Sequence, residues 1–174
     1  IITIGVKPTK PETGYGYIQS ADKIADNVFA VKSFKEKPDK VTAEKYLAEG
    51  NYYWNAGMFM FSIGRMETEL EQYIPEIVKI SQQGYEECVN NFSKMPDISI
   101  DYAVAEKSTH MAVMPMQDIY WNDIGSFDSI AEVLADKNGN GIYGDVIADD
   151  CQNTTILGCD RLISGIGLKN LIVV

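Results

Sequence analysis

The stretch Trp54-Asn55-Ala56-Gly57-Met58-Phe59 (WNAGMF) lies inside the apolar run 52–61, which predicts a buried strand interrupted by a polar Asn and a Gly. A helix is expected directly before it, because Asp39 can cap a helix that runs to about Glu49 and Gly50 suits its stop. Outward from this pair, strand-like and helix-like segments alternate. Strands are expected over 1–6, 15–18, 28–34 and 111–116, and helices over 66–74, 75–89, 100–107 and 126–134. The alternation predicts an α/β fold.

The character of the sequence changes after residue 137. Lys137-Asn138-Gly139-Asn140-Gly141 is a flexible break, and the segments after it have no helical period. Short β-type runs follow over 145–148, 154–157, 161–165 and 171–174. We therefore expect residues 1–137 to form the α/β part and residues 138–174 to begin a small all-β domain, either a solenoid or a barrel. Because strand-like runs stand at both ends, we also expect the chain to be a segment of a longer protein.

The net charge narrows the range of ligands. The 174 residues carry a formal net charge of −10, which opposes binding to nucleic acid, since that affinity comes largely from Lys and Arg neutralising phosphates. A small phosphate ligand needs only one local basic cluster, and the sequence offers one in Lys32, Lys35, Lys37 and Lys40. A solvated strand edge would explain the same cluster, so charge alone does not decide between the two.

The sequence also indicates where the protein works. No apolar run approaches the roughly 18 to 20 residues of a membrane span, and no signal peptide opens the chain. The three cysteines have spacings that match no metal pattern, and they fit reduced thiols. We expect a cytoplasmic protein without a membrane or a nucleic acid as partner.

The string Phe34-Lys35-Glu36-Lys37-Pro38 supplies paired charge at a strand end. Pro38 should push Lys37 towards extended geometry, where its ammonium is a ready point charge for a phosphate. Glu36 should point to the opposite side of the strand unless the backbone bulges, and its carboxylate can accept hydrogen bonds from two neighbouring hydroxyls of a sugar. The alternative is an exposed strand end with solvated charges.

Two further residues are candidates for holding the same ligand. Gly16 lies just before a predicted strand and could present its N–H group to a ligand oxygen, although an ordinary turn explains it equally well. Asn55 lies inside a buried run, where a polar side chain without partners costs on the order of 1 to 3 kcal/mol. A ligand hydroxyl or a group of the protein itself could be that partner.

Two aspartates are candidates near helix starts. Asp123 stands between an apolar strand and the helix that Ser126 can cap, and a carboxylate there could hold Mg²⁺, which prefers hard oxygens and keeps several waters. Asp101 lies in the first turn of the short predicted helix. Stabilisation of each carboxylate by a helix dipole is the alternative.

The order of these strings resembles the mannose-1-phosphate guanylyltransferase family. The resemblance is carried by Gly14-Tyr15-Gly16-Tyr17-Ile18, Phe34-Lys35-Glu36-Lys37-Pro38, Trp54-Asn55-Ala56-Gly57, Ser99-Ile100-Asp101-Tyr102-Ala103-Val104 and Trp121-Asn122-Asp123-Ile124-Gly125-Ser126. It implies a Rossmann-like nucleotidyltransferase fold and the formation of GDP-mannose and pyrophosphate from mannose 1-phosphate and GTP. The Trp-Asn-Ala-Gly and Ser-Ile-Asp-Tyr strings point to the mannose enzymes in particular.

The resemblance also implies a division of labour among residues. Gly16, Glu36, Asn55 and Asp101 would bind the sugar, Lys37 would bind its phosphate, and Asp123 would hold Mg²⁺. Lys37 and Asp123 would be the catalytic pair, facing each other across one cleft.

The family's Gly-rich nucleotide loop does not precede Ile1, so we expect little transferase activity from these residues alone. Two alternatives stay open, a glucose 1-phosphate enzyme using UTP, ATP or dTTP and a non-catalytic sugar-phosphate module. A homodimer stays open as well.

Overall fold

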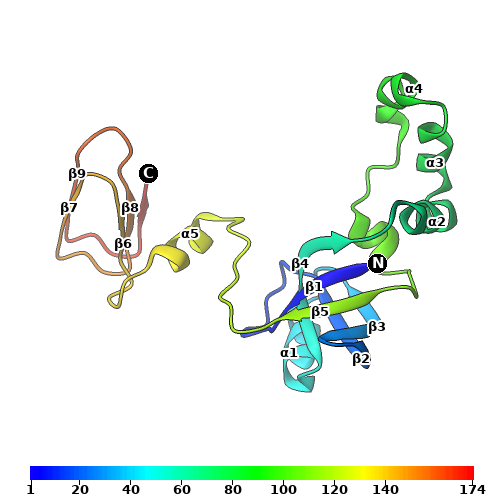
Figure 1. Cartoon of the computed structure of the whole chain (residues 1–174). Coiled ribbons are helices and arrows are strands. Elements are labelled where there is room, and N and C mark those ends of the chain that lie inside the picture. The colour runs from blue at the N-terminus through cyan, green and yellow to red at the C-terminus, as the bar shows by residue number, and fades with distance from the viewer. The chain divides into compact units, whose positions relative to one another are not determined.

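The computed structural model describes all 174 residues as two compact units, Ile1–Ile119 (unit 1) and Tyr120–Val174 (unit 2) (Figure 1). The sequence placed a domain boundary near Asn138. In the structure, helix α5 (Phe127–Leu134) instead belongs to the same unit as the strands that follow it. Leu134 of this helix packs closely on Gly141, where an added Cβ atom would lie 2.9 Å from the Cβ of Leu134. The predicted mixture of strands and helices followed by an all-β region is confirmed.

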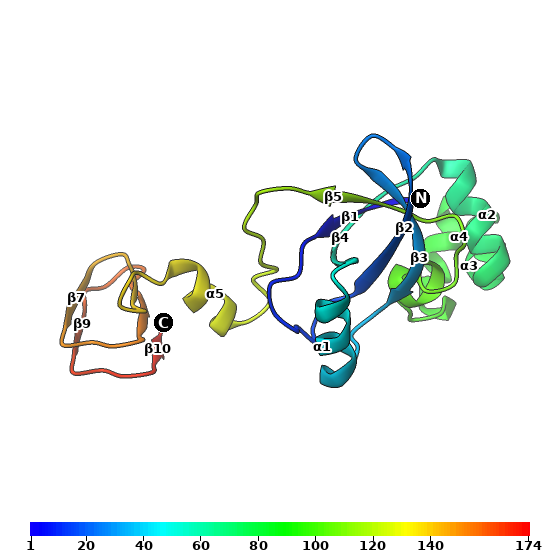
Figure 2. The same ribbon diagram turned by 90° about the horizontal axis from the view of Figure 1, so that it is seen from below.

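Five strands of unit 1 close into a barrel in the order β1-β4-β2-β3-β5 (Figure 2). They are β1 (Ile2–Val6), β2 (Tyr17–Ala25), β3 (Val28–Lys35), β4 (Tyr52–Met60) and β5 (Ala112–Met116). Only β1 and β5 pair in parallel, and every other neighbouring pair in the barrel is antiparallel. Strand β2 extends beyond the predicted 15–18 and continues to Ala25, before the chain turns at Asn27, whose φ is +52°.

Helix α1 (Lys40–Glu49) begins and ends where the sequence indicated. The Asp39 carboxylate accepts a hydrogen bond from the Thr42 N–H group, which satisfies a donor that the first helical turn leaves unpaired. Gly50 ends the helix in the left-handed region, at a φ of +76°.

The later helices differ from the prediction at one point. Helix α2 (Ile63–Tyr73) is followed by α3 (Pro75–Ser81), which begins at Pro75 as expected. The predicted continuation towards Val89 is wrong, since the chain breaks at Gly84, with a φ of +100°, and restarts as α4 (Tyr85–Asn90). A short 3-10 turn, η1 (Phe92–Lys94), follows.

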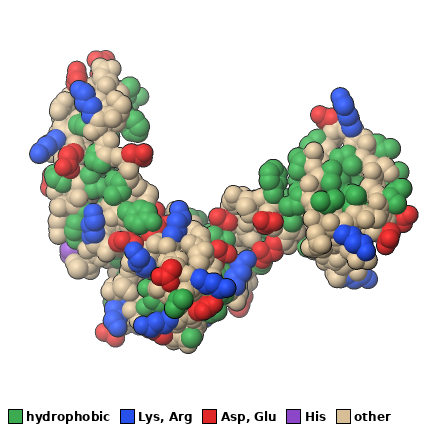
Figure 3. All heavy atoms as spheres, turned by 180° about the vertical axis from the view of Figure 1, so that it is seen from behind, with side chains coloured by type: hydrophobic (Ala, Val, Ile, Leu, Met, Phe, Trp, Pro, Cys, Tyr) green, Lys and Arg blue, Asp and Glu red, His purple; other side chains and the backbone are tan.

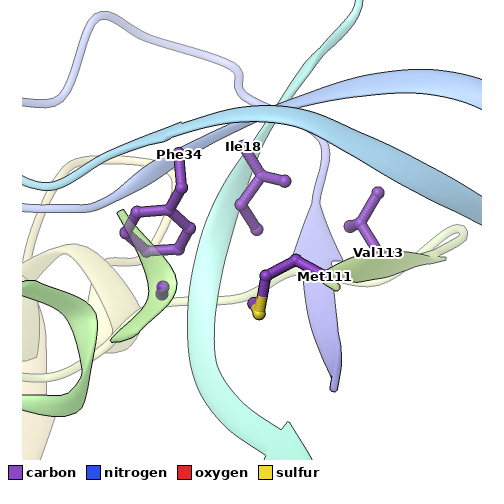
Figure 4. Packing of buried hydrophobic residues seen from close by; sticks show 5 residues of the cluster. Ile18, Phe34, Met111 and Val113 are labelled. Atoms are coloured by element: carbon purple, nitrogen blue, oxygen red, sulfur yellow. The ribbon is translucent and has the colours of Figure 1, made fainter. Parts of the chain in front are cut away.

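The core of unit 1 lies between the barrel strands and the turn that precedes β5. Ile18, Phe34, Met111 and Val113 point towards one another there (Figure 4), and Ala105 completes the cluster. Strand β4 is buried only over its first half: Trp54 and Asn55 are buried, whereas Met58 and Met60 are exposed. The expectation of a strand buried throughout is therefore wrong for its second half, which extends beyond this core.

The short helix predicted near residue 100 is a π-helix, η2 (Asp101–Ala105). The Glu106 N–H group bonds the Asp101 carbonyl oxygen, five residues earlier, at 2.9 Å. Ser99 does not cap it with a side-chain bond. The buried residues Ala103, Val104 and Ala105 fix this turn in the unit. Wide turns of this kind recur at functional sites.

Unit 2 begins with α5, which Ser126 caps as predicted by accepting a hydrogen bond from the Ser129 N–H group. Its strands are β6 (Gly141–Tyr143), β7 (Val146–Asp149), β8 (Thr155–Leu157), β9 (Ile163–Ile166) and β10 (Ile172–Val173). Strands β6, β8 and β10 pair in parallel, as do β7 and β9. Successive turns of the chain thus stack in register, which makes this region a β-solenoid rather than a barrel.

Side chains of different kinds gather on different surfaces. On the face in Figure 3, Lys and Arg are interspersed with Asp and Glu over unit 1, and hydrophobic side chains gather over unit 2. Exposed apolar residues of the solenoid include Ile142, Tyr143, Ile147 and Ile166. Among the helices, none is both long enough and apolar enough to cross a bilayer.

Candidate functional site

Strand register brings three of the predicted ligand residues into one row. Tyr17 of β2 stands opposite Lys35 of β3 and opposite Trp54 of β4. Both pairs of strands are antiparallel, so one step back along β2 corresponds to one step forward along β3 and β4. Gly16 therefore stands opposite both Glu36 and Asn55, and residues that stand opposite one another share a face of the sheet. The Asn55 N–H group accordingly donates to the Gly16 carbonyl oxygen at 2.8 Å. Together with Asp101 of η2, these residues form what we call the polar cluster: Gly16, Glu36, Asn55 and Asp101.

Glu36 supplies the cluster's buried charge. Its side chain is only 10% exposed, and its Oε2 atom is buried with no hydrogen-bond partner in the protein. Burial raises the pKa of this carboxyl, with the nearby Asp101 charge adding to the effect and Lys37 opposing it. A buried acceptor without a donor costs about 1 to 3 kcal/mol. Such an oxygen is suited to accept a hydrogen bond from a hydroxyl group of a ligand.

Gly16 is required at its position by space rather than by backbone conformation. A Cβ atom there would collide with Oε2 of Glu36 and would lie 3.0 Å from Cζ of Phe34 and 3.2 Å from Cβ of Asn55. Glycine therefore leaves the room that the Glu36 carboxylate occupies. This close approach gives Gly16 a physical role that an ordinary turn would not.

Asn55 is satisfied by groups of the protein itself. Its Oδ1 atom accepts from the Thr3 hydroxyl at 2.8 Å and from the Gly57 N–H group at 3.2 Å, and its Nδ2 atom donates to Oδ1 of Asp101 at 2.9 Å. The sequence left open whether the partner would be a ligand or the protein. In the structure Asn55 ties Asp101 of η2 to β1 and β4, and one hydrogen of its amide remains for a ligand.

Lys37 does not have the extended geometry that Pro38 predicted. Its φ is +45°, in the left-handed region, and its N–H group donates to the Tyr15 carbonyl oxygen at 3.2 Å. This backbone bond holds the turn against the preference of a residue before proline. The turn also brings Lys37 Nζ to 3.8 Å from Oε1 of Glu36. The two side chains therefore lie on the same side of the backbone, whereas neighbouring residues of an extended strand would point to opposite sides. The Lys37 side chain remains 59% exposed, as an anion-binding group requires.

Sequence reasoning missed two residues that hold this arrangement. Thr3 is fully buried in β1 and donates to Asn55, and Glu106 accepts from the Glu36 N–H group at 2.8 Å and from Lys35 Nζ at 3.2 Å. A polar residue within the first apolar run was a signal for Thr3. Nothing local marked Glu106, because its partners precede it by about seventy residues.

Asp123 belongs to unit 2, in the loop between β5 and α5, where its Oδ1 atom accepts from the Gly125 N–H group at 3.3 Å. Nowhere in the chain do three or more Asp, Glu, His or Cys side chains gather as a metal site would require. A single carboxylate fits Mg²⁺ only where waters and substrate phosphates complete the shell. That Lys37 and Asp123 face each other stays a prediction.

A hollow of 590 Å³ in unit 2 contains no residue of the polar cluster. It is lined by Phe127, Asn153 and Leu171 among others. The candidate site therefore rests on the polar cluster and Lys37 in unit 1, which bring a buried carboxylate and an exposed ammonium together.

Comparison with known proteins gives consistent matches. A family model described as nucleotidyl transferase matches residues 1–139. The Xanthan biosynthesis protein XanB of Xanthomonas campestris pv. campestris (strain ATCC 33913) is 44% identical over 185 residues, covering 100% of this chain and 39% of that protein. A mannose-1-phosphate guanylyltransferase of Escherichia coli is 39% identical, again over 100% of this chain and 40% of the relative.

The fold has a counterpart among solved structures. The crystal structure described as mannose-1-phosphate geranyltransferase from Thermus thermophilus matches with a TM-score of 0.87 and 27% identity, covering 98% of this chain and 52% of that one. The chain thus spans about two fifths of the length of the curated relatives it matches.

Proposed function

The chain belongs to the nucleotidyl transferase family, and on that premise we propose that it supplies the sugar-phosphate-binding residues of an enzyme that forms GDP-mannose and pyrophosphate from mannose 1-phosphate and GTP. The observation that carries the proposal is the buried Oε2 atom of Glu36, which has no donor in the protein and occupies the room that Gly16 leaves for it. The name of the 39% identical Escherichia coli relative supports the choice of mannose.

The geometry of unit 1 suits recognition of a sugar bearing a phosphate. Glu36 is the acceptor for sugar hydroxyls, and a carboxylate that accepts from two adjacent hydroxyls forms stronger bonds than a neutral group would. Asp101, oriented by Asn55, is a second acceptor. Lys37 Nζ, 3.8 Å from the Glu36 carboxylate, is the cation for the phosphate. Because the two groups lie this close together, one ligand that carries both sugar hydroxyls and a phosphate can reach both of them.

The reaction places simple demands on these residues. An oxygen of the sugar phosphate attacks the α-phosphorus of GTP, the bond from that phosphorus to the β-phosphate bridge breaks, and pyrophosphate leaves. Catalysis of such a step rests on holding two anions in line and neutralising their charge. Lys37 would offset the charge that otherwise keeps the attacking phosphate away from GTP. Mg²⁺ bound by Asp123 would supply a further positive charge on the phosphates.

Binding to the 174-residue chain tests the proposal directly. We expect isothermal titration calorimetry to detect mannose 1-phosphate and to show at least severalfold weaker binding of glucose 1-phosphate, which differs in the configuration of one hydroxyl. Glu36→Gln and Lys37→Ala should each weaken binding of mannose 1-phosphate by tenfold or more. Lys23→Ala, which removes an exposed cation outside the basic cluster, should leave it unchanged.

The alternatives give different results. Equal or tighter binding of glucose 1-phosphate would favour a nucleotidyltransferase for that sugar. Specific binding of mannose 1-phosphate, without pyrophosphate release when the remaining length of the relatives is fused to this chain, would favour a non-catalytic sensor. No binding of either sugar phosphate would refute the proposal.

We place the protein in the cytoplasm, because its cysteines, all free thiols, fit a reducing compartment.

A further inference from the structure

The π-helix η2 contacts the polar cluster with both of its ends. At its start, Asp101 accepts from Nδ2 of Asn55 in β4 at 2.9 Å. Just after its last residue, Oε1 of Glu106 accepts from the backbone N–H group of Glu36 at 2.8 Å. The i to i+5 bond between Glu106 and Asp101 sets the separation of these two contacts. One turn of backbone thus connects Asn55, inside β4, with Glu36, directly after β3.

Glu106 takes up a donor that the sheet itself leaves free. The Lys37 N–H group bonds Tyr15 on the side of β2, so the N–H group of the preceding Glu36 points to the opposite side, where β5 pairs with β3 only at Phe29 and Ala30. An N–H group bonded to a carboxylate is held more tightly than one bonded to a neutral acceptor. The same Glu106 oxygen lies 3.2 Å from Lys35 Nζ, and the Glu106 side chain is only 22% exposed. The backbone is therefore fixed immediately before Lys37 makes its left-handed turn.

The turn at Lys37 needs such support. A φ of +45° for a lysine before proline lies in a sparsely populated region that persists only where neighbouring structure holds it. Two bonds flank it, from the Glu36 N–H group to Glu106 and from the Lys37 N–H group to the Tyr15 carbonyl oxygen at 3.2 Å. Without the first, the chain can relax towards extended geometry and carry Lys37 Nζ away from the Glu36 carboxylate.

From this geometry we infer that Glu106 is a positioning residue, which holds Glu36 and Lys37 where a sugar and its phosphate bind. The inference rests on the proposed function and adds to it a residue that makes no contact with the ligand. The buried residues Ala103 to Ala105 anchor η2, so the Glu106 carboxylate is presented from a fixed support rather than from a mobile loop.

The test compares variants of the whole 174-residue chain by calorimetry with mannose 1-phosphate. Glu106→Ala should weaken binding about tenfold, whereas Glu106→Gln, which keeps an acceptor oxygen for the Glu36 N–H group, should stay within about threefold. Glu71→Ala on the exposed face of α2 is the matched control and should bind like the unmodified chain. Glu106→Ala added to Lys37→Ala should weaken binding by clearly less than tenfold further, because only the positioning of Glu36 is then left to lose.

Hydrogen exchange measured by NMR reports on the contact without any ligand. The Glu36 amide should exchange at least tenfold faster in Glu106→Ala than in the unmodified chain or in Glu71→Ala. Unchanged exchange, or full additivity with Lys37→Ala, would overturn the positioning role. Faster exchange with unchanged binding would also overturn it, and would leave the proposed function standing. If the unmodified chain binds no mannose 1-phosphate, the proposed function falls, and the positioning role falls with it.

Discussion

Replacing Asn55 by Ala should destabilise unit 1 through one hydroxyl group in particular. The Thr3 side chain is 0% exposed and donates to Oδ1 of Asn55 at 2.8 Å, so the substitution leaves that hydroxyl buried without an acceptor. The other two partners are less demanding, because Gly57 is exposed and Asp101 is half-buried, which lets water replace Asn55 at both. An orphaned buried hydroxyl costs about 1 to 3 kcal/mol, so with the lost contacts we expect the free energy of unfolding to fall by about 2 to 3 kcal/mol.

The assay is equilibrium unfolding in urea in a Trp121→Phe background, where the fluorescence comes from Trp54 alone, which is 3% exposed and adjacent to the substituted residue. For a domain of this size a loss of about 2 kcal/mol lowers the urea midpoint by about 1 M. The decisive measurement is a double-mutant cycle with Thr3→Val, which removes the hydroxyl. In the unmodified chain Thr3→Val should cost about 1 kcal/mol, but in Asn55→Ala it should be neutral or stabilising.

The coupling between the two substitutions should therefore be about 1 kcal/mol or more. If Thr3→Val destabilised both backgrounds equally, the hydrogen bond between Thr3 and Asn55 would not be the source of the loss. A fall of less than about 0.5 kcal/mol for Asn55→Ala, of the order seen at ordinary surface positions, would refute the reasoning altogether.

Three further outcomes are expected. Gly16→Ala should lower the urea midpoint, because the added Cβ crowds the buried Phe34 and Asn55 as well as the Glu36 carboxylate, and calorimetry should show binding of mannose 1-phosphate reduced tenfold or more; an unchanged midpoint with unchanged binding would contradict this. Glu36→Gln should stabilise the chain at pH 7 and not at acid pH. The pKa of Glu36 is raised in the folded state, so the folded state of the unmodified chain loses stability as pH rises through that pKa, and the Gln variant does not. A difference in stability that stays constant across pH in urea titrations would contradict this. Asp39→Ala should show the opposite dependence on pH, because the hydrogen bond from Thr42 lowers the pKa of Asp39. The variant should be less stable than the unmodified chain at neutral pH, and the difference should shrink as pH falls through that lowered pKa. A difference that persists at low pH would argue against the cap.

The sequence determined the features that depend on near neighbours. The cap at Asp39, the helix end at Gly50, the helix start at Pro75 and the cap at Ser126 are each set by a side chain or a backbone preference acting within one turn. The break at Gly84 was missed, because an apolar helical spacing extends across it while the backbone there takes a φ of +100°.

The sequence also contained the members of the polar cluster, though not their contacts. Gly16, Glu36 and Asn55 meet because strand register aligns β2 with β3 and β4, and register follows from packing across the whole barrel. Only the tertiary structure decided that Asn55 bonds Thr3 and Asp101, that Glu106 holds the N–H group of Glu36, and that Lys37 turns to a φ of +45°. These contacts join residues tens of positions apart, and the energy of burying polar groups, rather than any local preference, selects them.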